Sequence, residues 1–329
     1  MGPVLISKTG LVARRVLYLA MATAVTGCAQ PSTVPVDIRT PQTASGPLAH
    51  FYGNDWVSLS QPTNNEIVVY KRNPKTGTLK YYQTLGSGIS NPMGMLSTPN
   101  GRTYVANGGD SNVPVYRSTR KGFRGPIATL SDAGQIPTNV AVTPNRNLVA
   151  VSNQSTTTGG AGSVSVYLNR QNTPDHYLTY GSDPLQGEGV AIDSTGNCYW
   201  SFNDPDKLTG SIVEFYGCGG AGVPYATGIL DVGGVAVDDA GNLYFVDQLL
   251  GIWKCTAPNS CVLFLQAGLG ALLFPRNINF DNAQPQNMWV TDAAGYIDAV
   301  NLQGLLFYTL QTLGGALYPP FGVAPSPGG

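Results

Sequence analysis

The sequence predicts an all-β protein, a six-bladed β-propeller whose blades are four-stranded antiparallel sheets. Three observations lead to this prediction. First, the 329 residues include 41 Gly and 24 Pro but only 11% charged residues, which is typical of short strands joined by many turns. Second, one phrase recurs about every 45 residues. Third, the two ends of the repeat region each carry part of one further copy, so the ring can close.

The first 27 residues are typical of an export signal. A basic stretch ends in Arg14 and Arg15, and the apolar run 16–25 is too short to cross a membrane as a helix. The run leads into Val-Thr-Gly-Cys28, which resembles the bacterial lipobox, whose cysteine is lipidated and becomes the new N-terminus. We therefore expect an exported lipoprotein, anchored to a membrane through Cys28 and facing the periplasm or the cell surface. The alternative is an ordinary signal peptide cleaved near Ala29.

Residues 28–49 are rich in Pro, Thr, Ser and Gln, which predicts a lipid-anchored flexible tether before a propeller over residues 50–329. Once the signal is removed, the chain carries a net charge of about −4. This charge excludes nucleic acid as an expected partner. We expect a monomer.

The recurring phrase predicts the two inner strands of each blade. It runs from a small or Pro-led turn through a short apolar strand, a turn with Asn or Gly, and an aromatic-bearing strand to a final Asn or Asp. Its copies span 92–107, 137–153, 187–203, 232–247 and 275–292. A third strand of alternating pattern follows each copy, and a fourth apolar strand such as Val262–Leu265 closes most units.

The two ends of the repeat region together predict a sixth blade. Residues 320–327 repeat the first strand of a blade, and residues 51–85 supply the second to fourth strands. We therefore expect the ring to close by pairing of the N- and C-terminal strands, which removes open sheet edges.

The repeat resembles that of the NHL-type six-bladed propellers. Their signature is close to Gly-Val-Ala-Val-Asp-x-x-Gly-Asn-Leu-Tyr-Val-Ala-Asp, and residues 234–247 nearly reproduce it. The resemblance covers roughly residues 50–326. More narrowly, the chain looks like uncharacterised repeat lipoproteins of bacteria.

Four cysteines besides Cys28 predict two disulfides in an oxidising compartment. Cys255 and Cys261 bracket a turn-forming loop between two apolar strands, so they should lie within bridging distance. Cys198 and Cys218 then pair by elimination. The alternative, a metal site made of cysteines, lacks the CxxC spacings, and we expect no metal.

Two sets of residues recur in most blades, and for both a structural role is the expected one. The second strands end in Asn107, Asn153, Asn203, Asp247 and Asp292, side chains that commonly bond to nearby backbone. Three residues earlier stand Tyr104, Trp200, Tyr244 and Trp289, with Trp56 as the matching residue in the first blade, which we assign to the core between blades.

Residues that differ between blades are better candidates for function. One slot of the innermost strands carries Met93, Thr138, Glu188, Gly233, Arg276 and Phe321 in successive blades. Two of these are charged, Glu188 and Arg276, and Asn139 and Asn277 follow one step along their strands. We predict that these four residues line a ligand site at one mouth of the central channel. A solvated channel lining is the alternative.

Lactonase-type propellers, the regucalcin group, hold a divalent cation on carboxylates and amides at this slot. Such a likeness implies a Ca²⁺ site here. However, the slot offers a single carboxylate, Glu188, and Arg276 opposes a cation, so we expect no cofactor. Asp204 and Asp206 in the loop 203–210, together with Glu188, are a further Ca²⁺ alternative.

The sequence contains two histidines and lacks the short motifs of common hydrolases, so no assembled catalytic set is visible. We therefore expect a non-enzymatic scaffold that binds a protein, glycan or small ligand on one face, with the adjacent loops 154–162 and 203–210 as a rim. The alternative is a channel-mouth hydrolase or lyase with Glu188 as base and Arg276 as anion stabiliser. Catalytic residues remain unassigned beyond these two candidates.

Overall fold

The computed structural model describes residues 56–73, 78–268, 272–281, 286–302, 306–311 and 320–326. The predicted signal 1–27, Cys28 and the tether 28–49 lie outside these residues. Within them, no helix is long and apolar enough to cross a membrane. The two described helices are single 3-10 turns, η2 (Pro62–Asn64) and η3 (Tyr216–Cys218).

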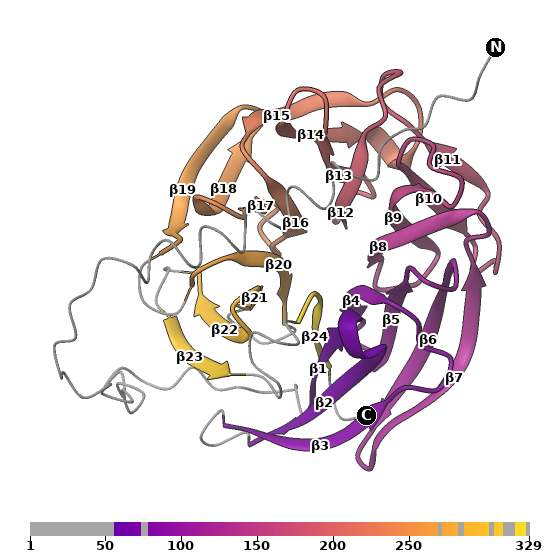
Figure 1. Cartoon of the computed structure of the whole chain (residues 1–329), viewed down its shortest axis with the longest axis vertical. Helices are drawn as coiled ribbons and strands as arrows, with labels where there is room; N and C mark the ends of the chain where they lie inside the picture. The colour runs from indigo at the N-terminus through magenta and orange to yellow at the C-terminus, as the bar shows by residue number, and fades with distance from the viewer. Residues whose placement is uncertain are drawn as a thin grey trace, which may run out of the picture. The chain divides into compact units, whose positions relative to one another are not determined.

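Six four-stranded antiparallel sheets surround a central axis, which confirms the predicted propeller (Figure 1). From the innermost strand outwards, blades 1 to 3 are β24 (Val323–Ser326), β1 (Trp56–Gln61), β2 (Glu66–Arg72), β3 (Leu79–Leu85); β4 (Pro92–Ser97), β5 (Arg102–Asn107), β6 (Asn112–Thr119), β7 (Gly122–Ser131); and β8 (Gln135–Val142), β9 (Leu148–Thr156), β10 (Ser163–Leu168), β11 (His176–Leu178).

Blades 4 to 6 follow the same order along the chain. They are β12 (Gln186–Ile192), β13 (Cys198–Asp204), β14 (Thr209–Phe215), β15 (Val223–Ile229); β16 (Val232–Val237), β17 (Leu243–Asp247), β18 (Gly251–Ala257), β19 (Ser260–Gln266); and β20 (Pro275–Phe280), β21 (Asn287–Asp292), β22 (Tyr296–Asn301), β23 (Leu306–Gln311).

The ring closes in blade 1 as the sequence predicts. Strand β24 pairs antiparallel with β1, with Trp56 opposite Ser326 and Leu59 opposite Val323. A buried ion pair joins this blade to blade 6, where an Arg72 nitrogen lies 3.8 Å from an Asp281 oxygen. The two ends of the propeller are therefore held by backbone pairing and by a charged contact across the closing interface.

The core lies between neighbouring blades, in clusters of apolar side chains contributed by both sheets. The recurring aromatic residues are all buried there, as predicted: Trp56, Tyr104, Trp200, Tyr244 and Trp289. The recurring Asn and Asp side chains fasten backbone loops. For example, Asp247 accepts bonds from the N–H groups of Leu249 and Leu250, and Asp292 from those of Leu273 and Phe274.

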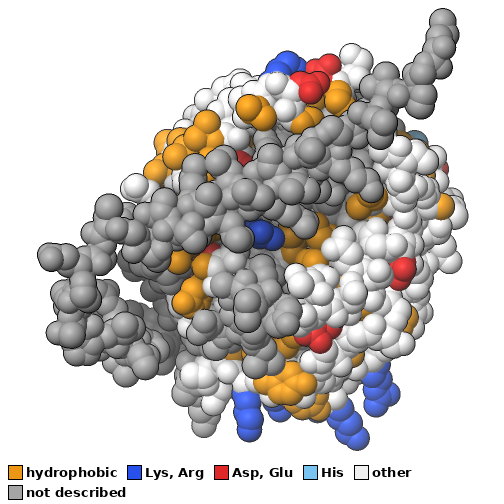
Figure 2. All heavy atoms as spheres, in the orientation of Figure 1, with side chains coloured by type: hydrophobic (Ala, Val, Ile, Leu, Met, Phe, Trp, Pro, Cys, Tyr) orange, Lys and Arg blue, Asp and Glu red, His pale blue; other side chains and the backbone are white. Residues whose placement is uncertain are grey.

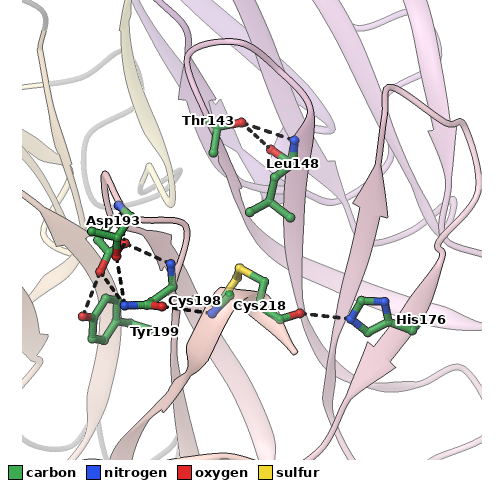
Figure 3. The surroundings of a disulfide bond; sticks show 10 residues. Thr143, Leu148, His176, Asp193, Cys198, Tyr199 and Cys218 are labelled. Atoms are coloured by element: carbon green, nitrogen blue, oxygen red, sulfur yellow. Dashed lines mark hydrogen bonds between the residues drawn. A yellow bond between two sulfur atoms is a disulfide. The ribbon is translucent and has the colours of Figure 1, made fainter. Parts of the chain in front are cut away.

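Both predicted disulfides are present. Cys255 and Cys261 lie opposite each other on β18 and β19, and Cys198 at the start of β13 is joined to Cys218 in η3 (Figure 3). The carbonyl of Cys218 also accepts a hydrogen bond from His176 Nε2 at 3.0 Å, which connects blade 4 to blade 3.

The innermost strands all run in one direction along the axis, so the channel has two chemically different ends. We call the end where these strands begin the amino-terminal mouth, and the end where they finish the carboxyl-terminal mouth. In five blades the pairing of the innermost strand shifts by a bulge near its start, for example between Gly187 and Gly189. A bulge re-aims the side chains at that point, and the charged residues of the slot lie there.

Candidate functional site

Two asparagines on opposite blades meet across the channel. Asn139 on β8 in blade 3 and Asn277 on β20 in blade 6 stand three blades apart in the ring, and Nδ2 of Asn139 donates to Oδ1 of Asn277 at 3.4 Å. Both side chains are about 95% buried. The pair therefore forms a floor that divides the channel between its two mouths.

The other four blades carry glycine at the same level of the innermost strand. These residues are Gly94, Gly189, Gly234 and Gly322. A Cβ on Gly94 would lie 2.7 Å from Cγ of Asn139, and a Cβ on Gly234 would collide with Oδ1 of Asn277. The glycines thus provide the space that the two amides fill.

The amides are held rigidly by their own backbone. Oδ1 of Asn139 accepts the N–H of Val140 at 2.7 Å, and Oδ1 of Asn277 accepts that of Ile278 at 2.8 Å. One layer further on, Nδ2 of Asn279 donates to the carbonyls of Met95 and Val323. Because buried amides need partners, this network fixes both layers.

A cavity of about 310 Å³ opens on the carboxyl-terminal side of this floor. Its lining combines aliphatic and polar side chains, and it includes the carboxylates of Asp193, Asp238, Asp239 and Asp281. Two of these carboxylates are engaged in their own turns: Asp193 with the N–H of Thr195, and Asp238 with the N–H of Ala240. The rim is acidic, and the residues that line the cavity include no Lys, Arg or His.

The two charged candidates lie on the amino-terminal side of the floor. Glu188 is half-buried at the bulge of β12 in blade 4, and Arg276 is half-buried near the start of β20 in blade 6. The Arg276 guanidinium lies 6.0 Å from the ring centre of Phe321 in blade 1. Blade 5 stands between the two residues in the ring, whereas the two asparagines are brought into contact.

An asparagine from the next strand orients Glu188. Asn203 Nδ2 lies 3.4 Å from the Glu188 carboxylate. Asn203 is itself fixed to the following blade, since its Oδ1 accepts the N–H of Val232 and its Nδ2 donates to the carbonyl of the same residue. In blade 4 the recurring Asn of the second strand therefore reaches a candidate functional residue.

The donors at this mouth do not fit a divalent cation. Glu188 is the one carboxylate of the slot, and the guanidinium of Arg276 lies at the same end of the channel. Across the described ranges, no group of three or more His, Cys, Asp or Glu is placed to hold a metal ion. Asp204, named above as a Ca²⁺ alternative, is paired with Lys207 Nζ at 2.6 Å, and this bond holds the pKa of Asp204 below its usual value. No reaction step is therefore assigned to a metal.

Comparison with solved structures supports the propeller fold. No protein-family model and no curated protein matches the sequence. A candidate 6-phosphogluconolactonase from Bacteroides fragilis NCTC 9343 aligns with a TM-score of 0.54 and 14% identity, over 83% of this chain and 98% of that chain. A second, from Bacteroides uniformis ATCC 8492, aligns with a TM-score of 0.51 and 15% identity, over 78% and 83%. A regucalcin described as a calcium-binding protein, from Agrobacterium tumefaciens str. C58, has a TM-score of 0.49 and 10% identity, over 67% and 74%.

These similarities correct one expectation from the sequence. The similar propellers are named as enzymes, so our interpretation of a non-enzymatic scaffold is wrong. The alternative that we gave, a channel-mouth hydrolase or lyase, agrees better with these names. The physical reason lies in the channel. The sequence shows scattered polar residues, whereas the fold brings Asn139 and Asn277 into contact across the channel and leaves a cavity on the carboxyl-terminal side of that contact.

Proposed function

We propose that the protein is a hydrolase of the lactonase-like propeller group, acting at the amino-terminal mouth of the channel. The observation that carries this proposal is the Asn139–Asn277 contact across the channel, with the charged side chains of Glu188 and Arg276 on its amino-terminal side. The names of the similar propellers support a lactone or a related ester as the substrate class.

The proposed chemistry needs a base and an anion stabiliser. Glu188, oriented by Asn203, takes a proton from water as the water oxygen attacks the carbonyl carbon of the lactone. The C–O bond of the ring then breaks, and the proton passes to the departing alkoxide oxygen. Arg276 stabilises the negative charge that develops on the carbonyl oxygen and that is lost when the C=O bond reforms. The product carboxylic acid then releases its remaining proton to solvent, which leaves the carboxylate beside Arg276.

Glu188→Gln tests this assignment. The amide keeps the shape and the contact with Asn203 but cannot take a proton, so turnover of a lactone panel should fall at least about 100-fold. Acid release on a pH-stat measures turnover, and thermal melting should show an unchanged Tm. Asp206→Asn, an exposed carboxylate in the loop after β13, is the matched control. Unchanged turnover in Glu188→Gln would exclude Glu188 as the base.

We also propose that the protein is an exported lipoprotein with an NHL-type repeat, anchored through Cys28. The two disulfides support an oxidising compartment. In cells, Cys28→Ala should move the protein from the membrane fraction to the soluble fraction, because a lipidated cysteine is needed for the anchor. A variant that still sediments with membranes would contradict the lipid anchor; Cys255→Ala is the control.

A further inference from the structure

Five arginines gather between blades 2 and 3, at the end of the propeller that bears the carboxyl-terminal mouth. Arg102, Arg117 and Arg124 stand opposite one another on β5, β6 and β7, so their side chains share one face of that sheet. Arg146 and Arg170 lie in the turns after β8 and β10 of blade 3. Burial, and then the charges of Arg146, Arg117 and Arg170, lower the pKa of Arg102.

This arrangement destabilises the folded protein unless something neutralises it. Like charges directly opposite each other on neighbouring strands repel. The ion pairs among the described residues involve other cations, namely Arg72, His176 and Lys207. Arg117, Arg124 and Arg170 are exposed, and the hairpin that joins β6 to β7 adds exposed Arg120 and Lys121. Figure 2 shows basic side chains projecting from the edge of the molecule where β3 and β7 lie.

The surface between β6 and β7 is hollow where two of these arginines lie. A cavity of about 410 Å³, open to solvent, is lined by Arg117, Ser118, Thr119, Arg124 and Ile127. Two of the five lining residues are arginines, so the hollow lies beside two exposed cationic side chains. A guanidinium fork matches the oxygen atoms of phosphate and forms paired charge-assisted bonds with them.

We propose that this arginine hollow binds phosphate groups, with Arg117 and Arg124 contacting the phosphate and Arg102, Arg146 and Arg170 supplying the surrounding positive charge. The acidic rim of the nearby mouth, on blades 4 to 6, repels anions and so confines them to blades 2 and 3. The phosphate belongs either to a soluble phosphorylated molecule or to the headgroup of an anionic phospholipid. This site is independent of the hydrolase proposal.

Two measurements distinguish the sources of phosphate. Titration calorimetry of the whole protein with inorganic pyrophosphate, at low salt, detects a soluble ligand. Co-sedimentation with vesicles of phosphatidylglycerol and phosphatidylcholine, against vesicles of phosphatidylcholine alone, detects a headgroup. Binding in either assay supports the proposal and names the source, whereas binding in neither overturns it.

Variants of Arg117 separate a built site from general attraction. Arg117→Gln should weaken binding at least about tenfold without lowering the Tm, because it removes both a phosphate contact and a repulsive neighbour. Lys207→Gln makes the same change of charge on the opposite face of the propeller and should bind as the parent does. Arg117→Lys keeps the charge but loses the fork, so it should also bind several-fold more weakly. Affinity equal to that of the parent in Arg117→Lys would overturn the site.

Discussion

The size of the side chain that each blade places at the axis determines where the channel floor lies. Two amides fill the axis, and four glycines leave the space that they occupy. Each amide accepts the N–H of the residue that follows it, so it cannot swing aside without losing a buried hydrogen bond. Size and hydrogen bonding therefore act together to keep the channel closed.

This complementarity predicts a measurable coupling between Gly234 and Asn277. Gly234→Ala should destabilise the protein by about 1–3 kcal/mol, because its methyl group meets the Asn277 side chain. In an Asn277→Gly background the same methyl group finds space, so its cost should be smaller by at least about 1 kcal/mol. Urea unfolding of the four proteins measures the coupling. Gly241→Ala, in a turn where a Cβ meets nothing within 4 Å but φ is +82°, is a control that should not depend on Asn277. Additive costs for Gly234→Ala and Asn277→Gly would contradict the steric account.

At the scale of elements, the sequence predicts the strands and their order almost completely. The recurring phrase marks the two inner strands of five blades, because its turn residues and alternating apolar residues are local signals. The ring closure by β24 and β1 is also predictable, since the two chain ends carry complementary parts of one blade. The disulfides follow from the same strand assignment, with Cys255 opposite Cys261.

The channel floor could not be predicted in the same way. Asn139 and Asn277 are named as candidates from sequence, but their contact depends on which blades face each other and on the bulges that aim the side chains. The sequence signal that could reveal this contact is one position of the repeat that carries Asn in two blades and Gly in the other four. The arginine hollow escapes prediction for a similar reason, because Arg102 and Arg170 are 68 positions apart in the sequence.

At the scale of the whole molecule, two buried acids make stability depend on pH. Burial raises the pKa of Asp298 to about 7 and that of Asp132 to about 6. Asp298 accepts a bond from Thr309, and Asp132 from Ser165, which limits but does not cancel the effect of burial. Both acids therefore favour folding most when they are protonated.

The sign follows from the direction of the shift. Below about pH 4 Asp298 is protonated in both the folded and the unfolded chain. As the pH rises toward 7 the unfolded chain loses this proton first, so the stability that Asp298 contributes falls, by about 1.4 kcal/mol per pH unit at most. Asp298→Asn should therefore gain stability relative to the parent at about pH 8 compared with about pH 4, as measured by urea unfolding. Asp206→Asn should show no such change. A difference between Asp298→Asn and the parent that is the same at both pH values would contradict the raised pKa.

The amide floor also has a consequence for how molecules enter and leave the propeller. Because Asn139 and Asn277 meet across the axis, a ligand cannot diffuse through the channel from one mouth to the other. In the hydrolase that we propose, a substrate that enters beside Glu188 must leave, once converted, through the same mouth. Product and substrate then compete for the same mouth, so accumulated product should slow turnover as a competitive inhibitor. Ligands that bind in the cavity at the opposite mouth should not change this inhibition.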